Sequence, residues 1–181
     1  MHYKFIDLSN LDEIQEKILR NIPEDSRSRS DFLIFTPDVF EKCVPLVHAV
    51  ETIRPWSEVH AIGLMIVMPK ESNSVHTDLG HIAETKYALN IPIYNCNIPY
   101  TSFFRVIKEP ETTEVEFGAE NRIYQYMQYD DDCVQEIARM HLYKPAIFNT
   151  QIPHKVSNPT DDVRIAMSLR FTTALDLSKG I

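Results

Sequence analysis

The 181-residue sequence has few cysteines and no long apolar run. Its three cysteines, Cys43, Cys96 and Cys133, are odd in number and lack metal-type spacing, which argues against a disulfide framework. The longest apolar run, residues 61–68, is far too short to span a bilayer, and the N-terminus lacks the apolar core of a signal peptide. We therefore expect a soluble, cytoplasmic protein with no membrane partner.

Basic residues are fewer than acidic residues. The chain has 18 Lys and Arg against 26 Asp and Glu, a formal net charge of -8. Nucleic-acid binding depends on a basic footprint that neutralises phosphates, so the composition argues against a nucleic-acid partner. A small anion can still bind at a local arginine.

Low-complexity tracts and internal repeats are absent, and the length with 44% hydrophobic residues suits one sizeable core. We expect a single domain over residues 1–181. Helical apolar spacing occupies about residues 9–53, in one helix over 11–19 and a second over 39–50 with a kink at Pro45. The polar stretches 23–30 and 109–116 are expected to be surface loops.

From Val59 onward the pattern changes to short β-rich runs separated by Pro, Gly, Asn and Asp. The expected strands cover residues 59–68, 74–78, 85–93, 101–108, 122–129, 145–157 and 163–173, with one helix near 132–140. Many short strands preceded by helices predict a mainly β fold, a jelly roll with core at about 59–173 and N-terminal helices packed on one outer face. An immunoglobulin-like sandwich would fit the strands but not the helical start.

Two histidines and one aspartate are the most informative residues. His76 and Asp78 lie two apart, so on a strand both side chains project from the same face, and His154 is a distant third donor. Two imidazoles and one carboxylate occupy one face of an octahedron and leave positions open, as non-haem iron(II) oxygenases require. The alternatives are that His76 ends a strand while Asp78 caps the following turn, that His154 is a hydrogen-bonded strand histidine, or that His81 competes as a ligand.

Arg164 follows His154 by ten residues on a strand whose faces differ in chemistry. Arg164, Ala166 and Ser168 alternate with large apolar residues that should pack against the helices. The small face leaves room before the guanidinium, which can bind a carboxylate through two parallel hydrogen bonds. The alternative is a salt bridge from Arg164 to Asp161 or Asp162.

These four residues resemble the 2-oxoglutarate/iron(II)-dependent oxygenases. The resemblance implies a double-stranded β-helix of the cupin-like kind, with His76, Asp78 and His154 as iron ligands and Arg164 holding the far carboxylate of 2-oxoglutarate.

The run YALNIPIYN is similar to the strand after the first ligands in amino-acid and peptidyl hydroxylases. Many members have Ser or Thr two residues after the arginine, where this chain has Ala166, and Ser168 is a candidate substitute. Asn90 and either Tyr124 or Tyr126 are further candidate contacts to 2-oxoglutarate. The alternatives are that Asn90 only ends a strand and that the tyrosines only pack on a sheet face.

The function expected by resemblance is an oxygenase that uses Fe(II), 2-oxoglutarate and dioxygen, releases succinate and CO2, and hydroxylates a small-molecule or peptidyl substrate. Its specificity is expected to depend on loops such as 80–86 and 109–121. The alternatives are a non-catalytic cupin-like jelly roll that binds a metal or small anion, an interaction protein on a degenerate oxygenase fold, and a zinc hydrolase.

Overall fold

Two antiparallel sheets build the computed structural model, which describes residues 2–24, 27–79, 86–108, 113–117, 124–173 and 175. Within these residues the first sheet has the order β1 (Tyr3–Phe5), β10 (Ala146–Asn149), β5 (Tyr87–Tyr94), β12 (Arg164–Phe171), β3 (Val59–Val67) and β2 (Asp31–Phe35). The second has the order β7 (Thr113–Phe117), β8 (Tyr124–Tyr129), β4 (Val75–Leu79), β11 (His154–Ser157), β6 (Tyr100–Val106) and β9 (Val134–His141).

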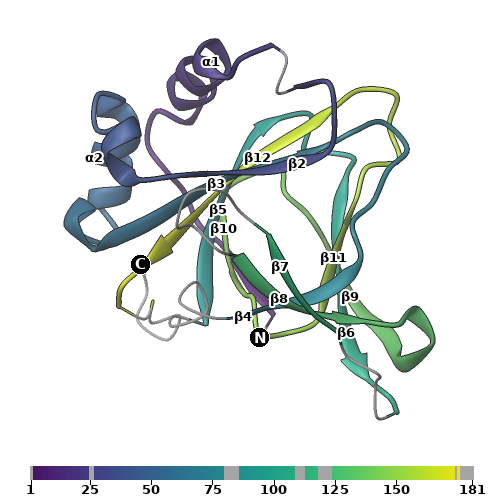
Figure 1. Ribbon diagram of the computed structural model, residues 1–181. Coiled ribbons are helices and arrows are strands. Elements are labelled where there is room, and N and C mark those ends of the chain that lie inside the picture. The colour runs from purple at the N-terminus through teal and green to yellow at the C-terminus, as the bar shows by residue number, and fades with distance from the viewer. Residues whose placement is uncertain are drawn as a thin grey trace.

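The path of the chain through these sheets is that of a double-stranded β-helix. The strands β3, β4, β5 and β6 alternate between the first and second sheets, and β9, β10, β11 and β12 then alternate back. The second run of strands pairs with the first, since β12 lies beside β3 and β5 while β11 lies between β4 and β6. This winding confirms the predicted mainly β jelly roll (Figure 1).

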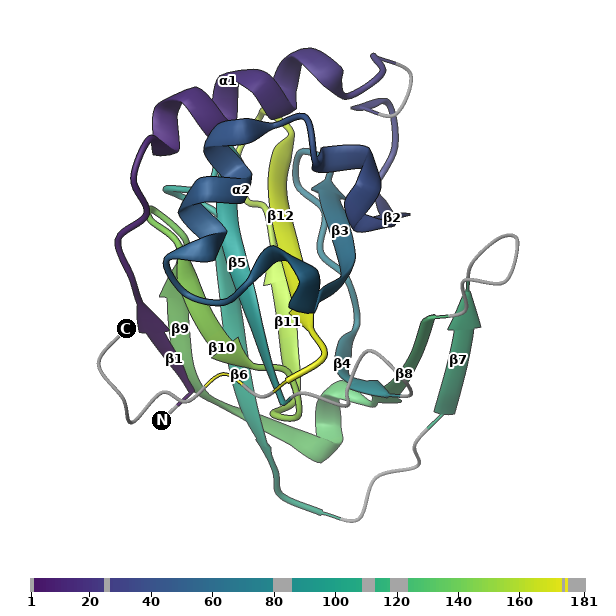
Figure 2. The same ribbon diagram turned by 90° about the vertical axis from the view of Figure 1, so that its left-hand side faces the viewer.

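The helices cover the outer face of the first sheet, as predicted (Figure 2). They are α1 (Leu11–Asn21) and α2 (Val44–Glu51), with the short 3-10 turns η2 (Pro37–Phe40) and η3 (Trp56–Glu58). Apolar spacing places Ile14 and Ile18 on one side of α1, where both are fully buried in the core beneath β5. In the described part of the chain, no helix is long and apolar enough to cross a membrane.

β12 is the strand that joins the outer core to the interior between the sheets. All eight of its residues are buried. Ile165, Met167, Leu169 and Phe171 pack into the core beneath the helices, whereas Ala166 belongs to a smaller core between the two sheets. The predicted contrast between the two faces of this strand is therefore confirmed. The smaller core fills only part of the interior, and the remainder holds the candidate site.

The helix predicted near residues 132–140 is wrong. That segment forms the 3-10 turn η5 (Asp131–Cys133) followed by β9, which pairs with β6 along its whole length. The register shifts opposite Phe103 and Phe104, which leaves Ile137 as an extra, exposed residue. This bulge interrupts the simple alternation along β9, and pairing with β6 outweighs the local pattern.

Other boundaries also differ from the prediction. The single run 145–157 is two strands in different sheets, β10 and β11, and the expected loop 109–116 contains β7 from residue 113 onward, while 109–112 lie outside the described residues. The second helix is η2 followed by α2, and Pro45 lies in the first turn of α2 rather than at a kink. A first-turn proline loses no hydrogen bond because the N–H groups there have no partner within the helix.

Truncating the outer face of β12 should destabilise the fold. Leu169 is completely buried, so Leu169→Ala is expected to lower the free energy of unfolding by about 3 kcal/mol through lost burial and the cavity left behind. Ile137→Ala, at the exposed bulge, should change it by less than about 0.5 kcal/mol. Urea denaturation of the two variants checks this, and similar losses for both would contradict the core position of Leu169.

Candidate metal centre

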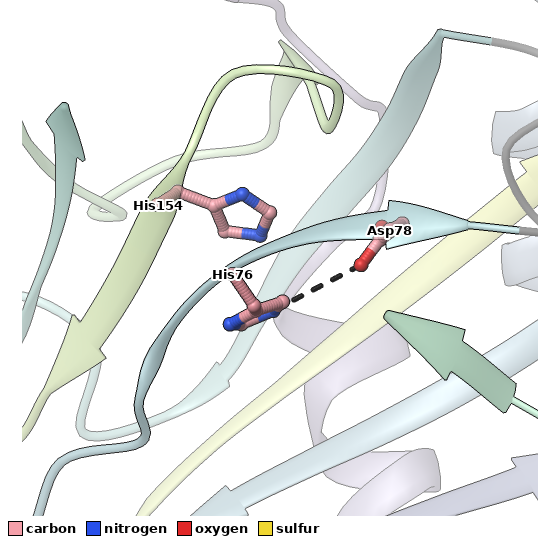
Figure 3. A group of neighbouring side chains, drawn as sticks. All are labelled: His76, Asp78 and His154. Atoms are coloured by element: carbon pink, nitrogen blue, oxygen red, sulfur yellow. Dashed lines mark ion pairs between the residues drawn. The ribbon is translucent and has the colours of Figure 1, made fainter. Parts of the chain in front are cut away.

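The neighbouring strands β4 and β11 bring three potential metal ligands together. His76 and Asp78 lie two residues apart on β4, and the Cα of His154 on β11 is the direct partner of the Cα of His76. One donor atom from each of the three side chains lies within 4.8 Å of the other two. Figure 3 shows the three side chains lying near one another beside these two strands. The predicted convergence of this triad is therefore present in the fold.

Backbone carbonyls orient both imidazoles. Nδ1 of His76 donates to the Ser74 carbonyl and Nδ1 of His154 donates to the Ile152 carbonyl, each at 2.9 Å. Because a carbonyl can only accept, each Nδ1 carries a proton, and in the neutral imidazole the lone pair then lies on Nε2. The two rings lie 4.4 Å apart between centroids. This is the tautomer in which both histidines can bind a metal through Nε2.

Asp78 is held in place by a buried arginine. Nη2 of Arg170 donates to Oδ2 of Asp78 at 2.6 Å, and both side chains are largely buried. The other carboxylate oxygen, Oδ1, lies 3.8 Å from Nε2 of His76. Arg170 therefore fixes one oxygen of the carboxylate. The second oxygen is directed toward His76, as the dashed line in Figure 3 shows.

Burial and neighbouring charges set the protonation of this group. Burial lowers the pKa of His154 to about 3, and the nearby His76 contributes in the same direction. Burial alone would raise the pKa of Asp78, but the Arg170 guanidinium and the two imidazoles outweigh it, so that pKa is lowered. At neutral pH the cluster thus offers a neutral imidazole at His154 and an ionised carboxylate at Asp78, the forms that bind metals.

A cavity of about 310 Å³ opens directly over the triad. We call it the metal-side cavity; its walls include His76, Asp78, His154, Arg170, Tyr126 and Phe148. The Tyr126 ring meets the His76 ring edge-on at 5.4 Å, and the Phe148 ring meets the His154 ring edge-on at 5.2 Å. These aromatic contacts restrict the rotation of both imidazoles and supply apolar walls beside the metal-binding atoms.

Arg164 is buried at the start of β12, and it does not line the metal-side cavity. It borders a separate small cavity together with Met65, Asn90 and Ala166, and its Nη1 lies 3.7 Å from the Met65 sulfur. Asp161 pairs with Lys70 and Asp162 accepts from Tyr94, so neither forms the alternative salt bridge. Among the described residues no carboxylate pairs with Arg164, and its Nε has no hydrogen-bond partner.

Of the other predicted contacts, Ser168 and Asn90 line the metal-side cavity. Both are buried and are direct partners across β12 and β5, and within the described part of the chain the Ser168 hydroxyl has no hydrogen-bond partner. Tyr124 lies on β8, but its side chain is outside the described part of the structure, whereas Tyr126 lines the cavity.

Three stretches of the expected specificity loops lie outside the described residues, namely 80–85, 109–112 and 118–121. His81, the alternative ligand, is in the first of them.

Arg170 is the residue that sequence reasoning missed. It lies six residues after Arg164, so the alternation of β12 puts it on the same inward face as Arg164, Ala166 and Ser168. That signal was present in the sequence. The pairing with Asp78, 92 residues away, depends on how the two sheets face each other.

A second group of possible donors, Asp130, Asp132 and Cys133, lies at η5. Both aspartates are exposed, and Asp132 forms an ion pair with Lys108. An exposed acidic group that already has a cation as its partner does not indicate a metal site.

Comparison with known proteins yields similarity at the level of structure only. No protein-family model matches the chain, and no curated protein matches it in sequence. Similar solved structures include a variant of Bacillus subtilis oxalate decarboxylase, at 10% identity, TM-score 0.38 and coverage of 88% of this chain and 30% of that one. Another is vicilin from Capsicum annuum, at 11% identity, TM-score 0.41 and coverage of 86% and 31%. The chain thus spans about a third of the length of these proteins, and the jelly-roll assignment rests on its own strand order.

Proposed function

We propose that the protein is a non-haem iron(II) and 2-oxoglutarate-dependent dioxygenase that hydroxylates a small-molecule or peptidyl substrate. The observation that carries the proposal is the convergence of one imidazole nitrogen from each of two histidines and one carboxylate oxygen at the wall of a cavity large enough for a small molecule. Two imidazoles and one carboxylate suit iron(II) with positions left open for other ligands.

The residues present fit such a metal. The Nε2 atoms of His76 and His154 are free to bind because each Nδ1 is engaged by a carbonyl, and Asp78 supplies the single anionic ligand. Bound iron(II), with 2-oxoglutarate as co-substrate, would supply the oxidation of a C–H bond by dioxygen.

The remaining tasks fall to side chains around the metal-side cavity. Arg170 keeps Asp78 ionised and correctly oriented. Arg164 is a buried cation with no carboxylate partner among the described residues. Buried charges are normally paired, so an anionic co-substrate would complete its environment. The Ser168 hydroxyl and Asn90 offer hydrogen bonds between the two arginines, while Phe148 and Tyr126 exclude water from the reacting atoms.

Spectroscopy and product analysis test the proposal together. Adding 2-oxoglutarate to the iron(II)-loaded chain without oxygen should produce a metal-to-ligand charge-transfer band. In air, the same protein should form succinate above the level given by iron alone. Iron binding with neither band nor succinate would reject the dioxygenase.

Removing the buried cation should weaken co-substrate binding. Arg164→Met is expected to weaken 2-oxoglutarate binding by about 100-fold, the scale for deleting one partner of a desolvated charge pair. Arg105→Met, at a solvent-exposed arginine on β6, removes the same charge away from the cavities and should leave the affinity unchanged. Calorimetric titration of both variants measures this, and equal affinities would remove Arg164 from the co-substrate site.

A second candidate is a jelly roll that binds a metal or a small anion without redox turnover. The observation that favours it is that Arg164 lines a small cavity separate from the metal-side cavity, with Met65 among the residues that line both. In that case the iron-loaded chain would bind metal without forming succinate, and anion binding would be independent of the metal.

A further inference from the structure

Met65 lies between the two cavities. The small cavity, which we call the Arg164 cavity, shares Met65, Asn90 and Phe148 with the metal-side cavity and is otherwise lined by residues including Arg164 and Ala166. Its volume is only about 10 Å³, against about 310 Å³ on the metal side. The Met65 sulfur lies 3.7 Å from Nη1 of Arg164, in the space that an anion bound to this guanidinium would need.

The register of the first sheet explains how Met65 reaches Arg164. On the inward face, Met65 of β3 is the direct partner of Ala166 of β12, while Val67 is the partner of Arg164. Direct partners on one face of a sheet have Cβ atoms about 5 Å apart, so a small residue at 166 leaves room that its neighbour can fill. The Met65 side chain lines both cavities, and its sulfur contacts the Arg164 guanidinium.

A thioether is a poor partner for a buried guanidinium. Arg164 is only 3% exposed, and a sulfur of this kind is a weak acceptor. Methionine has three rotatable side-chain bonds and adapts easily to irregular space. Since Met65 borders the larger cavity, rotation of its side chain toward that cavity would join the two spaces and expose Arg164 to a ligand near the metal.

We propose that Met65 is a gate over Arg164, and that it sets the affinity for dicarboxylates by having to rotate before a carboxylate can reach this arginine. This inference deepens the proposed function, since it rests on Arg164 as the anion-binding group. The closed side chain reduces the apparent affinity by the fraction of time that the site is open.

Glutarate separates the gate from the metal chemistry. It has two carboxylates but no 2-oxo group, so it cannot form the 2-oxo-acid chelate, and its binding to the metal-free chain reports on Arg164 alone. Calorimetric titration of the full chain, with and without manganese(II), should show Met65→Ala binding glutarate about five-fold more tightly than the wild type. Met68→Ala, the same substitution just beyond β3 and outside both cavity walls, should bind within about two-fold of the wild type.

A double variant tests whether the gain depends on Arg164. Arg164→Met should remove most glutarate binding, and adding Met65→Ala to it should restore none. No gain in Met65→Ala, or a gain that persists without Arg164, would overturn the gate. So would the absence of glutarate binding from all five proteins. An Arg164-dependent gain in a chain that forms no succinate would support the gate while rejecting the dioxygenase.

Discussion

Asp78→Ala is expected to abolish metal binding and, with it, succinate formation. Asp78 is the one anionic member of the triad and its carboxylate lies beside His76. Loss of an outer hydrogen-bond partner of a ligand costs about 10–100-fold in metal affinity, so loss of the ligand itself should cost at least about 100-fold. Anaerobic titration with iron(II), followed by a succinate assay in air, measures both effects.

Two further variants make this result interpretable. Asp78→Asn keeps an oxygen acceptor for Arg170 while removing the negative charge, so it distinguishes loss of the ligand from loss of the fold. Asp31→Ala removes another carboxylate from the wall of the metal-side cavity and should retain metal binding. Wild-type iron affinity in Asp78→Asn and Asp78→Ala would mean that the metal binds elsewhere.

Arg170→Met is expected to destabilise the metal-free protein by about 3–5 kcal/mol. The ion pair with Asp78 is largely buried, and removing one member of such a pair leaves the other charge without a partner inside the protein. Bound metal should offset part of this loss because it supplies a new positive partner for Asp78. Urea denaturation with and without manganese(II) measures the free energy of unfolding in both states.

An exposed ion pair provides the matched control. Arg139 pairs with Glu136 at 3.0 Å on β9, with side chains that are 46% and 38% exposed. Arg139→Met makes the same chemical change, and an exposed pair contributes at most about 1 kcal/mol. If Arg170→Met cost no more than Arg139→Met, Arg170 would not be the partner that supports Asp78. Combining Arg170→Met with Asp78→Ala should cost less than the sum of the two single changes, since they remove partners of one pair.

Strand periodicity allowed part of the site to be predicted directly. Residues two apart on a strand share a face, which places His76 with Asp78 on β4 and sets the two chemistries of β12. The apolar side of β12 and the apolar stripe of α1 could likewise be identified because each has a local repeat. These features depend only on neighbouring residues, so no knowledge of the sheet order was needed.

Local patterns failed where strand pairing decides the structure. The sequence predicts a helix near residues 132–140, yet most of this segment forms β9 because β6 offers partners along its length and a bulge accommodates Ile137. The division of residues 145–157 into β10 and β11 follows from each half pairing in a different sheet. Strand pairing joins residues that are distant in sequence, so it cannot be predicted from the pattern of neighbouring residues.

The sequence by itself determined the identity and the relative facing of the donor residues, together with the jelly-roll class. Only the tertiary structure decided which residues meet. It placed His154 opposite His76, paired Arg170 with Asp78, and brought the Met65 sulfur into contact with Arg164. The physical reason is that side-chain facing follows from backbone geometry within one strand, whereas contacts between strands depend on register and on the packing of two sheets.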